Sequence, residues 1–239
     1  MEEQIPLADK VVRELKRKIL MGELSINERL PSERELAERY KVSRITIREA
    51  ISKLGNLGFV HTLPQSGTFI SNFRRDGSLD LLIDILSSGE EVERSLLVEF
   101  LEIRRMFECH ITGRAVMRMR EEERKRLDAM VDALIDAIDA PDRMAEIDYT
   151  IHTFLMDLAD NSVLRIFFNS FRPIYQFYLK TFYSHRDNAS GIIPYYERLC
   201  RAVEMRNERV AAFVMGELLD YAEIATIALM EKSDGIRII

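Results

Sequence analysis

The residues best suited to chemistry in this chain are cations and hydroxyls gathered around one predicted helix start. Ser43 is expected to cap that helix, Arg44, Thr46 and Arg48 follow within its first two turns, and Arg34 lies on the helix before it. Guanidinium groups form paired hydrogen bonds with phosphate oxygens and with the edge of guanine, and hydroxyls can bind either. This set therefore predicts contact with DNA.

A second set lies in the larger C-terminal part. Asp148 and His152 are four residues apart and share one face of a predicted helix, where they could bind a metal ion or form a buried hydrogen-bonded pair. Arg104 shares a helical stripe with Leu97 and Leu101, and a cation that points inward needs an anionic partner. That partner is either an internal carboxylate, from Asp148 or a glutamate, or the carboxylate or phosphate of a ligand.

The stretch from residue 30 to residue 72 supplies the elements that position the first set. Ser32 and Glu35 have the spacing of a capping box at the start of a short helix. A second helix, amphipathic and cationic at its start, follows after a tight turn, so the two form a helix-turn-helix. Residues 59–63 and 67–71 then predict two short strands, the arms of a hairpin wing.

At these residues the sequence resembles the GntR family of bacterial winged-helix transcription regulators. The family signature is L-P-S-E-R-E-L-A, a V-S-R-x-T-[IV]-R-x-A-[IL]-x-x-L recognition helix and G-T-F at the wing tip, which match residues 30–37, 42–54 and 67–69. Three linked motifs in one order are highly specific. The resemblance implies a recognition helix in the major groove and a wing in the minor groove. The wing residues implied at the DNA are Gln65, Ser66, Gly67 and Thr68.

Composition and charge divide the chain into a basic N-terminal part, here called the head, and an acidic remainder, here called the body. The 239 residues are 47% hydrophobic, enough for two cores. Residues 1–75 hold 14 Lys/Arg and 10 Asp/Glu, a net charge of +4, whereas the remainder holds 20 and 30, a net charge of −10. Only the head is therefore expected to attract phosphate. Two distant cysteines, no signal peptide and no long apolar run predict a cytoplasmic protein without a membrane segment.

The expected fold class is mainly α, with three helices and a small β wing followed by an all-α bundle. We predict a winged helix-turn-helix domain over residues 1–74, a linker helix within 75–90 that packs on the body, and an effector-binding and dimerisation domain over 91–239. Glycines at 89 and 191 are expected to break helices. The body helices predicted are 91–118, 121–139, 142–160, 162–184, 191–206 and 208–231.

The whole chain also resembles the FadR subfamily of GntR regulators, the fatty-acid-regulator type with a helical effector domain. Most members share a buried metal site, which consists of an Asp, a His four residues on and two later His. Asp148 and His152 match the first pair, but residues 195–197 (Tyr-Tyr-Glu) and 217–219 (Glu-Leu-Leu) stand where the later ligands are expected. The residues favour a hydrogen-bonded pair over a metal site completed by Glu217 or water, so no cofactor is expected.

Loss of the later histidines is shared with the fatty-acid regulator itself, whose body is implied to bind long-chain acyl-CoA without a metal. An aromatic series from Phe167 to Tyr183, continued at Tyr195 and Tyr196, is either simple core or the wall of an apolar tunnel. The residues expected to contact the effector are Arg104, Asp148, His152, Tyr175 and Tyr196.

The leading hypothesis is a homodimeric repressor of fatty-acid metabolism that acyl-CoA releases from a palindromic operator. The alternative is a regulator of carbon metabolism that senses a small organic or sugar acid, with or without a metal at Asp148 and His152. A constitutive DNA-binding protein whose body only dimerises stays open. An enzyme is not expected, because the sequence has no nucleophile–base spacing, phosphate loop or complete metal cage.

Overall fold

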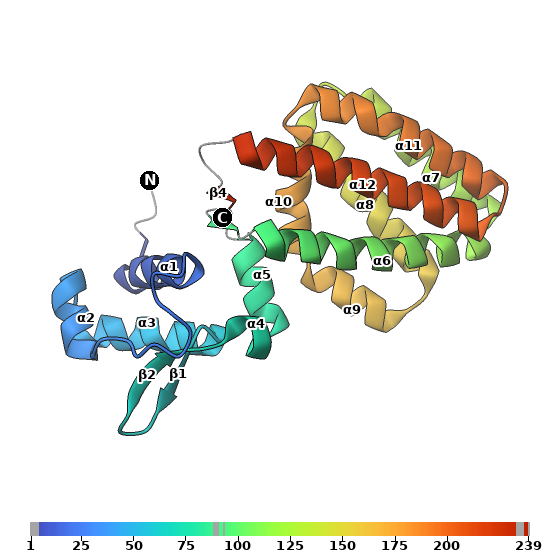
Figure 1. The fold of residues 1–239 in the computed structure, drawn as a ribbon. Coiled ribbons are helices and arrows are strands. Elements are labelled where there is room, and N and C mark those ends of the chain that lie inside the picture. The colour runs from blue at the N-terminus through green and yellow to red at the C-terminus, as the bar shows by residue number, and fades with distance from the viewer. Residues whose placement is uncertain (1–4, 88–90, 93, 233–236, 239) are drawn as a thin grey trace. The chain divides into compact units, whose positions relative to one another are not determined.

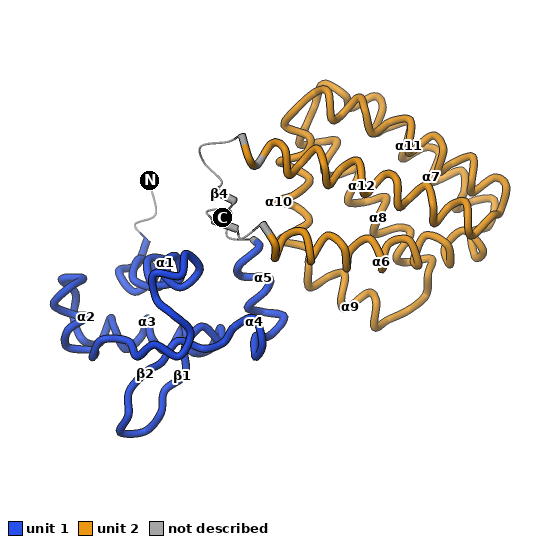
Figure 2. The backbone as a smooth tube through the Cα atoms, viewed as in Figure 1, with its two compact units in different colours: residues 1–91, 239 blue, residues 92–238 orange. Residues whose placement is uncertain are grey.

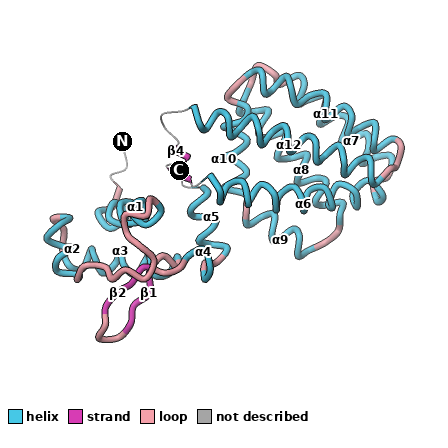
Figure 3. The backbone as a smooth tube through the Cα atoms, in the orientation of Figure 1, coloured by secondary structure: helices cyan, strands magenta, loops and turns pink. Residues whose placement is uncertain are grey.

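The computed structural model describes residues 5–87, 91–92, 94–232 and 237–238, so the break expected at Gly89 lies outside the described residues. The chain forms two compact units, residues 1–91 with 239 and residues 92–238, which we call the head and the body (Figure 2). Helices dominate both units, and a hairpin of two strands projects from the head (Figures 1 and 3). None of the described helices is long and apolar enough to cross a membrane.

The core of the head lies between α1 (Leu7–Leu20) and α3 (Arg44–Leu57), which pack against each other. Each helix repeats apolar residues at a spacing of three or four, so one face of each is buried. The buried stripes are Val11, Leu15 and Ile19 on α1 and Ile47, Ala50 and Leu54 on α3.

The helix-turn-helix consists of α2 (Glu33–Tyr40) and α3. Ser32 and Glu35 form the predicted capping box, in which the backbone N–H of Ser32 donates to the Glu35 carboxylate at 2.8 Å. Lys41 has a left-handed φ of 55°, which ends α2 and turns the chain within three residues. Gly58, with a φ of 92°, ends α3 in the same way. The predicted pair of short helices is confirmed.

The wing is an antiparallel hairpin of β1 (Val60–Leu63) and β2 (Gly67–Ile70), paired residue for residue. Its turn requires positive φ values at Gln65 (64°) and Gly67 (115°). A β-bridge joins Arg29 to Phe69, so the segment before α2 lies along the outer edge of β2.

After the wing come the one-turn helix α4 (Phe73–Asp76) and α5 (Leu79–Ser87). α5 packs on the head, because Leu81 lies over Gly58 at the end of α3 and Asp84 forms an ion pair with Lys16 of α1. The prediction that this apolar segment packs on the body is therefore wrong. The physical reason is that α5 packs on α3 with its apolar residues Leu81 and Ile85 buried, while the ion pair of Asp84 ties it to α1.

The body is an all-α bundle, as predicted. α8 packs against α6, α7 and α10 and is buried along more than half of its length. Two-residue strands, β3 (Glu91–Val92) and β4 (Arg237–Ile238), lie near the two ends of the body in the sequence. Its helices are α6 (Arg94–Arg118), α7 (Glu121–Asp136), α8 (Pro141–Ala159), α9 (Ser162–Ser170), α10 (Arg172–Tyr183), α11 (Arg186–Glu204) and α12 (Glu208–Lys232).

Two predicted boundaries in the body are wrong. The stretch 162–184 forms two helices, because the chain turns at Phe171 and the following Pro173 has no N–H with which to continue α9. The break predicted at Gly191 is absent, since this residue lies inside α11. A Cβ at Gly191 would lie 1.9 Å from the hydroxyl of Tyr221 on α12. Glycine here lets the Tyr221 ring lie close against α11 and does not end the helix.

Candidate functional site

The DNA-reading residues predicted at the start of α3 are exposed to solvent. The side chains of Arg44 and Arg48 are 64% and 67% exposed, and Arg34 on α2 is 75% exposed. The Ser43 hydroxyl caps α3 by accepting a hydrogen bond from the Thr46 N–H at 3.1 Å. Guanidinium groups beside a helix N-terminus suit phosphate, because the helix dipole has its positive end there.

The predicted residues of the wing tip form a second exposed group. Gln65 and Ser66 are exposed, and Gly67 and Thr68 are partly exposed. The guanidinium of Arg29 lies against Gly67, where a Cβ would be 2.7 Å from its Nε. Arg29 therefore adds a positive charge to the wing. The sequence did not indicate this, because Arg29 lies in a connecting loop.

Glu33 lies beside the arginines predicted to contact DNA, whose exposed surface we call the reading face, although the sequence pattern did not single it out. Its carboxylate accepts hydrogen bonds from Arg48 Nε at 3.2 Å and Nη2 at 2.9 Å, and it lies 4.0 Å from Arg44 Nη2. The hydrogen bonds from Arg48 lower the pKa of Glu33 and raise the pKa of Arg48 itself. Glu33 therefore orients Arg48, whose side chain stays exposed toward solvent.

An apolar side chain also lies on this face. Ile45, directly after Arg44, is 78% exposed, and an exposed apolar group beside a base-reading arginine can contact the methyl group of thymine. Lys53, which shares the polar side of α3, has a different role. Its ammonium contacts Asp9 of α1 at 2.7 Å and Glu49 at 3.0 Å, so it joins the two helices.

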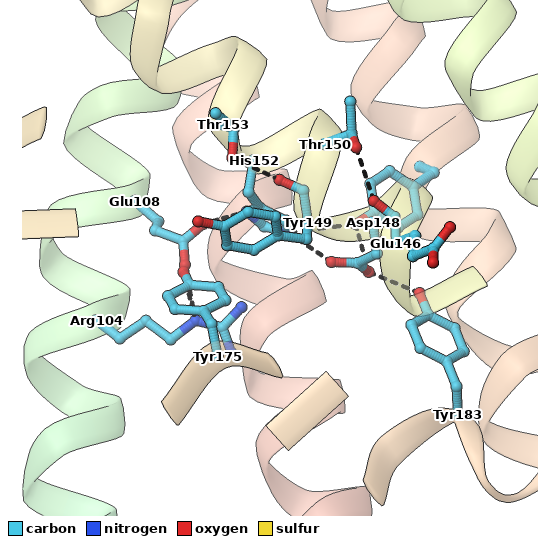
Figure 4. A network of polar contacts seen from close by, with 11 residues as sticks. Arg104, Glu108, Glu146, Asp148, Tyr149, Thr150, His152, Thr153, Tyr175 and Tyr183 are labelled. Atoms are coloured by element: carbon cyan, nitrogen blue, oxygen red, sulfur yellow. Dashed lines mark hydrogen bonds and ion pairs between the residues drawn. The ribbon is translucent and has the colours of Figure 1, made fainter. Parts of the chain in front are cut away.

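In the body, the five residues predicted to contact an effector come from four helices and meet in one buried network, of which Figure 4 labels all but Tyr196. Glu108, one turn after Arg104 on α6, joins them. Its Oε1 accepts a hydrogen bond from Arg104 Nε at 2.7 Å, and its Oε2 is bound by His152 Nδ1. Arg104 Nε also donates to Tyr175 Oη at 2.8 Å. The five predicted residues are Arg104, Asp148, His152, Tyr175 and Tyr196.

Asp148 forms the other end of the network. Its Oδ2 accepts hydrogen bonds from Tyr183 Oη at 2.6 Å and from Tyr196 Oη at 2.8 Å. His152 Nε2 lies 3.2 Å from Tyr196 Oη and 3.4 Å from Asp148 Oδ1. The two ring nitrogens of His152 therefore face two different carboxylates. Tyr183 was visible in the sequence only as one member of the aromatic series.

The network balances its own charges. Burial disfavours the charged form of Arg104, but Glu108, Tyr178 and Asp148 outweigh burial and raise the pKa of Arg104. Burial likewise acts to raise the pKa of Glu108, yet His152 and Arg104 lower it. The pKa of His152 is raised by Glu108 and Asp148 against the effect of burial. Two cations thus face two carboxylates.

The residues present do not fit a transition-metal site. Within the described part of the chain, no group of three or more His, Cys, Asp and Glu side chains could hold a metal ion. His152 presents both nitrogens to carboxylates, and a protonated imidazole has no lone pair for a metal. Glu217, the residue considered for completing the site, is hydrogen-bonded by Arg198 at 2.5 Å. Tyr196, near the position implied for a third ligand, donates to Asp148 instead.

A small apolar cavity adjoins the network between α6, α8, α9 and α10. Its volume is about 20 Å³, which is room for one water-sized group. Arg104 and Glu108 are its charged lining residues, and the rings of Phe107 and Phe167 narrow it with their centroids 5.2 Å apart. The lining residues from the predicted aromatic series are Phe167, Phe168, Phe171 and Tyr175.

Comparisons with known proteins identify both units. Residues 7–70 match the bacterial regulatory proteins of the gntR family, and residues 99–221 match the FCD domain. The chain is 29% identical over 228 residues to HTH-type transcriptional regulator Mce2R of Mycobacterium tuberculosis, which covers 93% of this chain and 92% of that protein. It is 27% identical over 170 residues to the fatty acid metabolism regulator protein of Cronobacter sakazakii, with 71% and 70% covered.

The solved structure of E. coli McbR/YncC has the same fold, with a TM-score of 0.54, 16% identity and coverage of 94% of this chain and 99% of that one. The resemblance read from the motifs is thereby confirmed over head and body alike. The chain belongs to the GntR family of bacterial regulatory proteins and is a helix-turn-helix transcriptional regulator, not an enzyme, with a FadR-type FCD domain as its body.

Proposed function

We propose that this regulator is a cytoplasmic, homodimeric repressor that binds a palindromic operator through two heads. Each α3 places Ser43, Arg44 and Arg48 at base edges in the major groove, and the wing tip, residues 64–68, enters the minor groove. The exposure of both arginines supports this assignment. A twofold dimer suits a palindrome, because both repeat one unit by the same rotation.

The proposed effector is a long-chain acyl-CoA or fatty acid whose alkyl chain binds at the cavity beside Arg104 and Glu108. The observation that carries this proposal is the cavity lining, which apart from these two residues and Tyr175 is apolar. Burial of an alkyl chain there gains about 0.8 kcal/mol for each methylene. The similarity to a fatty acid metabolism regulator over 71% of the chain gives independent support.

Binding of a long chain requires α9 to move. The cavity of about 20 Å³ holds one water-sized group, so the alkyl chain must take the space of Phe167 and Phe168. α9 has only nine residues and exposes Val163 (70%) and Ile166 (67%) on its outer side. Its displacement biases the body toward a second conformation, and the change reaches the head through residues 79–86. Effector binding thereby lowers operator affinity.

Thermal melts of the purified protein with oleoyl-CoA, oleate, free CoA, zinc and a chelator test the proposal. A ligand at about one hundred times its Kd adds about 2.7 kcal/mol of stability, which shifts the midpoint clearly. We expect stabilisation by oleoyl-CoA but not by CoA, no effect of chelator, and release of operator DNA over the same concentration range. Destabilisation by chelator without an acyl-CoA effect would overturn the proposal and return Asp148 and His152 to a metal site for a small acid. Melts unmoved by any ligand would indicate a constitutive DNA-binding protein.

A further inference from the structure

The carboxylate of Glu108 is bound as a protein binds the carboxylate of a small acid. One oxygen accepts a hydrogen bond from Arg104 Nε at 2.7 Å, and the other is bound by His152 Nδ1 from a different helix (Figure 4). Glu108 is only 4% exposed. Two cationic donors that converge on the two oxygens of one carboxylate form the usual recognition site for an organic acid. We call the place between these two nitrogens the carboxylate position.

The charges of this site already balance one another, so a second acid would add an uncompensated negative charge. The charged side chains buried in the described part of the body are Arg104, Glu108, Asp148 and His152, two of each sign. His152 Nε2 faces Asp148 at 3.4 Å, and the Arg104 guanidinium carbon lies over the Tyr175 ring at 4.3 Å. A carboxylate brought in by a ligand would leave one buried negative charge without a partner, which is strongly unfavourable.

We propose that Glu108 is the built-in occupant of the carboxylate position and determines ligand class. While it is in place, the body rejects small organic and sugar acids and accepts ligands that bury only an uncharged portion. This inference rests on the proposed sensing function, because Glu108 and Arg104 also line the apolar cavity assigned to the effector. The charged end of the effector then stays outside the network.

Chemical rescue tests this assignment, since Glu108→Ala removes a fragment the size of acetate. We expect the melting temperature of Glu108→Ala to fall by roughly 5–15 °C. Acetate should restore part of the loss in a saturable manner, relative to chloride at the same ionic strength. Wild type should show no saturable response to acetate, lactate or gluconate. Glu102→Ala, which removes an exposed carboxylate from the same helix, is the matched control and should behave as wild type.

If Glu108→Ala does not fold alone, refolding from denaturant with and without acetate or formate gives the same information. Recovery of folded protein only with the small acid supports the assignment. Failure of both acids to rescue the variant, by melting or by refolding, would overturn it, as would saturable stabilisation of wild type by lactate or gluconate. These outcomes are separate from the proposed function, which stands or falls on binding of oleate and oleoyl-CoA by wild type.

Discussion

Arginines in the head and in the body carry the same charge, but those that contact solvent in the head contrast with a buried one in the body. The side chain of Arg44 is 64% exposed, and its nearest carboxylate oxygen, on Glu33, is 4.0 Å away. Arg104 is 7% exposed and has Glu108 at 2.7 Å and Tyr175 at 2.8 Å. Water stabilises the first guanidinium, so it needs no close carboxylate, whereas the second would be several kcal/mol less stable if left unpaired.

This difference in exposure determines which kind of ligand each unit can accept. Exposure leaves the reading face with positive charge that DNA phosphates and guanine edges can match. Burial forces the body to match each charge internally, so a ligand gains most there by offering apolar surface. Under the function proposed above, the head binds through its charge and the body binds a ligand through apolar surface.

The largest effect that sharpens this comparison is expected from Arg104→Met. Loss of the buried cation leaves Glu108 with His152 alone, and breaking a buried ion pair costs about 3–5 kcal/mol of unfolding free energy. Its neighbour Arg105 is the control, because it forms an exposed pair with Asp220 at 2.6 Å. Arg105→Met should cost at most about 1 kcal/mol. If denaturant melts show equal losses of unfolding free energy for Arg104→Met and Arg105→Met, then Arg104 is not the buried arginine of this pair.

The next effect belongs to the head. Arg44→Ala should weaken specific operator binding by about 1–3 kcal/mol, because a base-contacting arginine is lost, and should leave the melting temperature and the dimer unchanged. Fluorescence anisotropy with operator and scrambled DNA measures this. Lys125→Ala removes a cation of similar exposure, 71%, from the body and should not change binding. An unchanged footprint for Arg44→Ala would remove α3 from the role of recognition helix.

A smaller effect is expected at the helix that covers the cavity. The Asn161 side chain caps α9 by accepting hydrogen bonds from the N–H groups of Val163 and Leu164, both at 3.1 Å. Asn161→Ala should lower the stability of α9 by about 1 kcal/mol and speed hydrogen exchange of its amides about fivefold. Asn169→Ala, at the exposed far end of the helix, should not. Unchanged exchange in the first variant would contradict the role of the cap.

The most gradual effect is on pH dependence. The folded pKa of His152 is raised, so its charge stabilises the body fully below the ordinary histidine value of about 6.5, and this is lost as pH rises through the folded value. The folded pKa of Glu108 is lowered, so its contribution is present above the ordinary value of about 4.3 and is lost as pH falls through the folded value. We expect wild type to lose melting temperature on the alkaline side more steeply than His152→Gln. Parallel pH curves for the two proteins would contradict the charged imidazole.

Local chemistry explains what the sequence made predictable. The capping box at Ser32, the caps at Ser43 and Gly58, and the three linked motifs all act within a few residues, so the head could be read almost completely. In the body, the helical phase of the sequence was sufficient to predict that Arg104 points inward and that Asp148 lies beside His152. These predictions depend on one helix at a time.

What depends on packing between helices was not predictable. Glu108 binds His152 across 44 residues, and Tyr183 reaches Asp148 across 35, so neither pairing has a signature in local spacing. The packing of Leu81 over Gly58 is a similar case, because the apolar face of α5 fits the head and the body equally well on composition alone.

The glycine inside α11 has a consequence for how this chain can vary. A helical interior glycine is about 1 kcal/mol less favourable than alanine, so an isolated helix would gain from Gly191→Ala. Here the Tyr221 hydroxyl stands 1.9 Å from the added carbon, so the Tyr221 ring must move aside before the helix can gain from alanine. The two positions therefore form an epistatic pair: in a combinatorial library, the gain from alanine at 191 should be larger when position 221 is small.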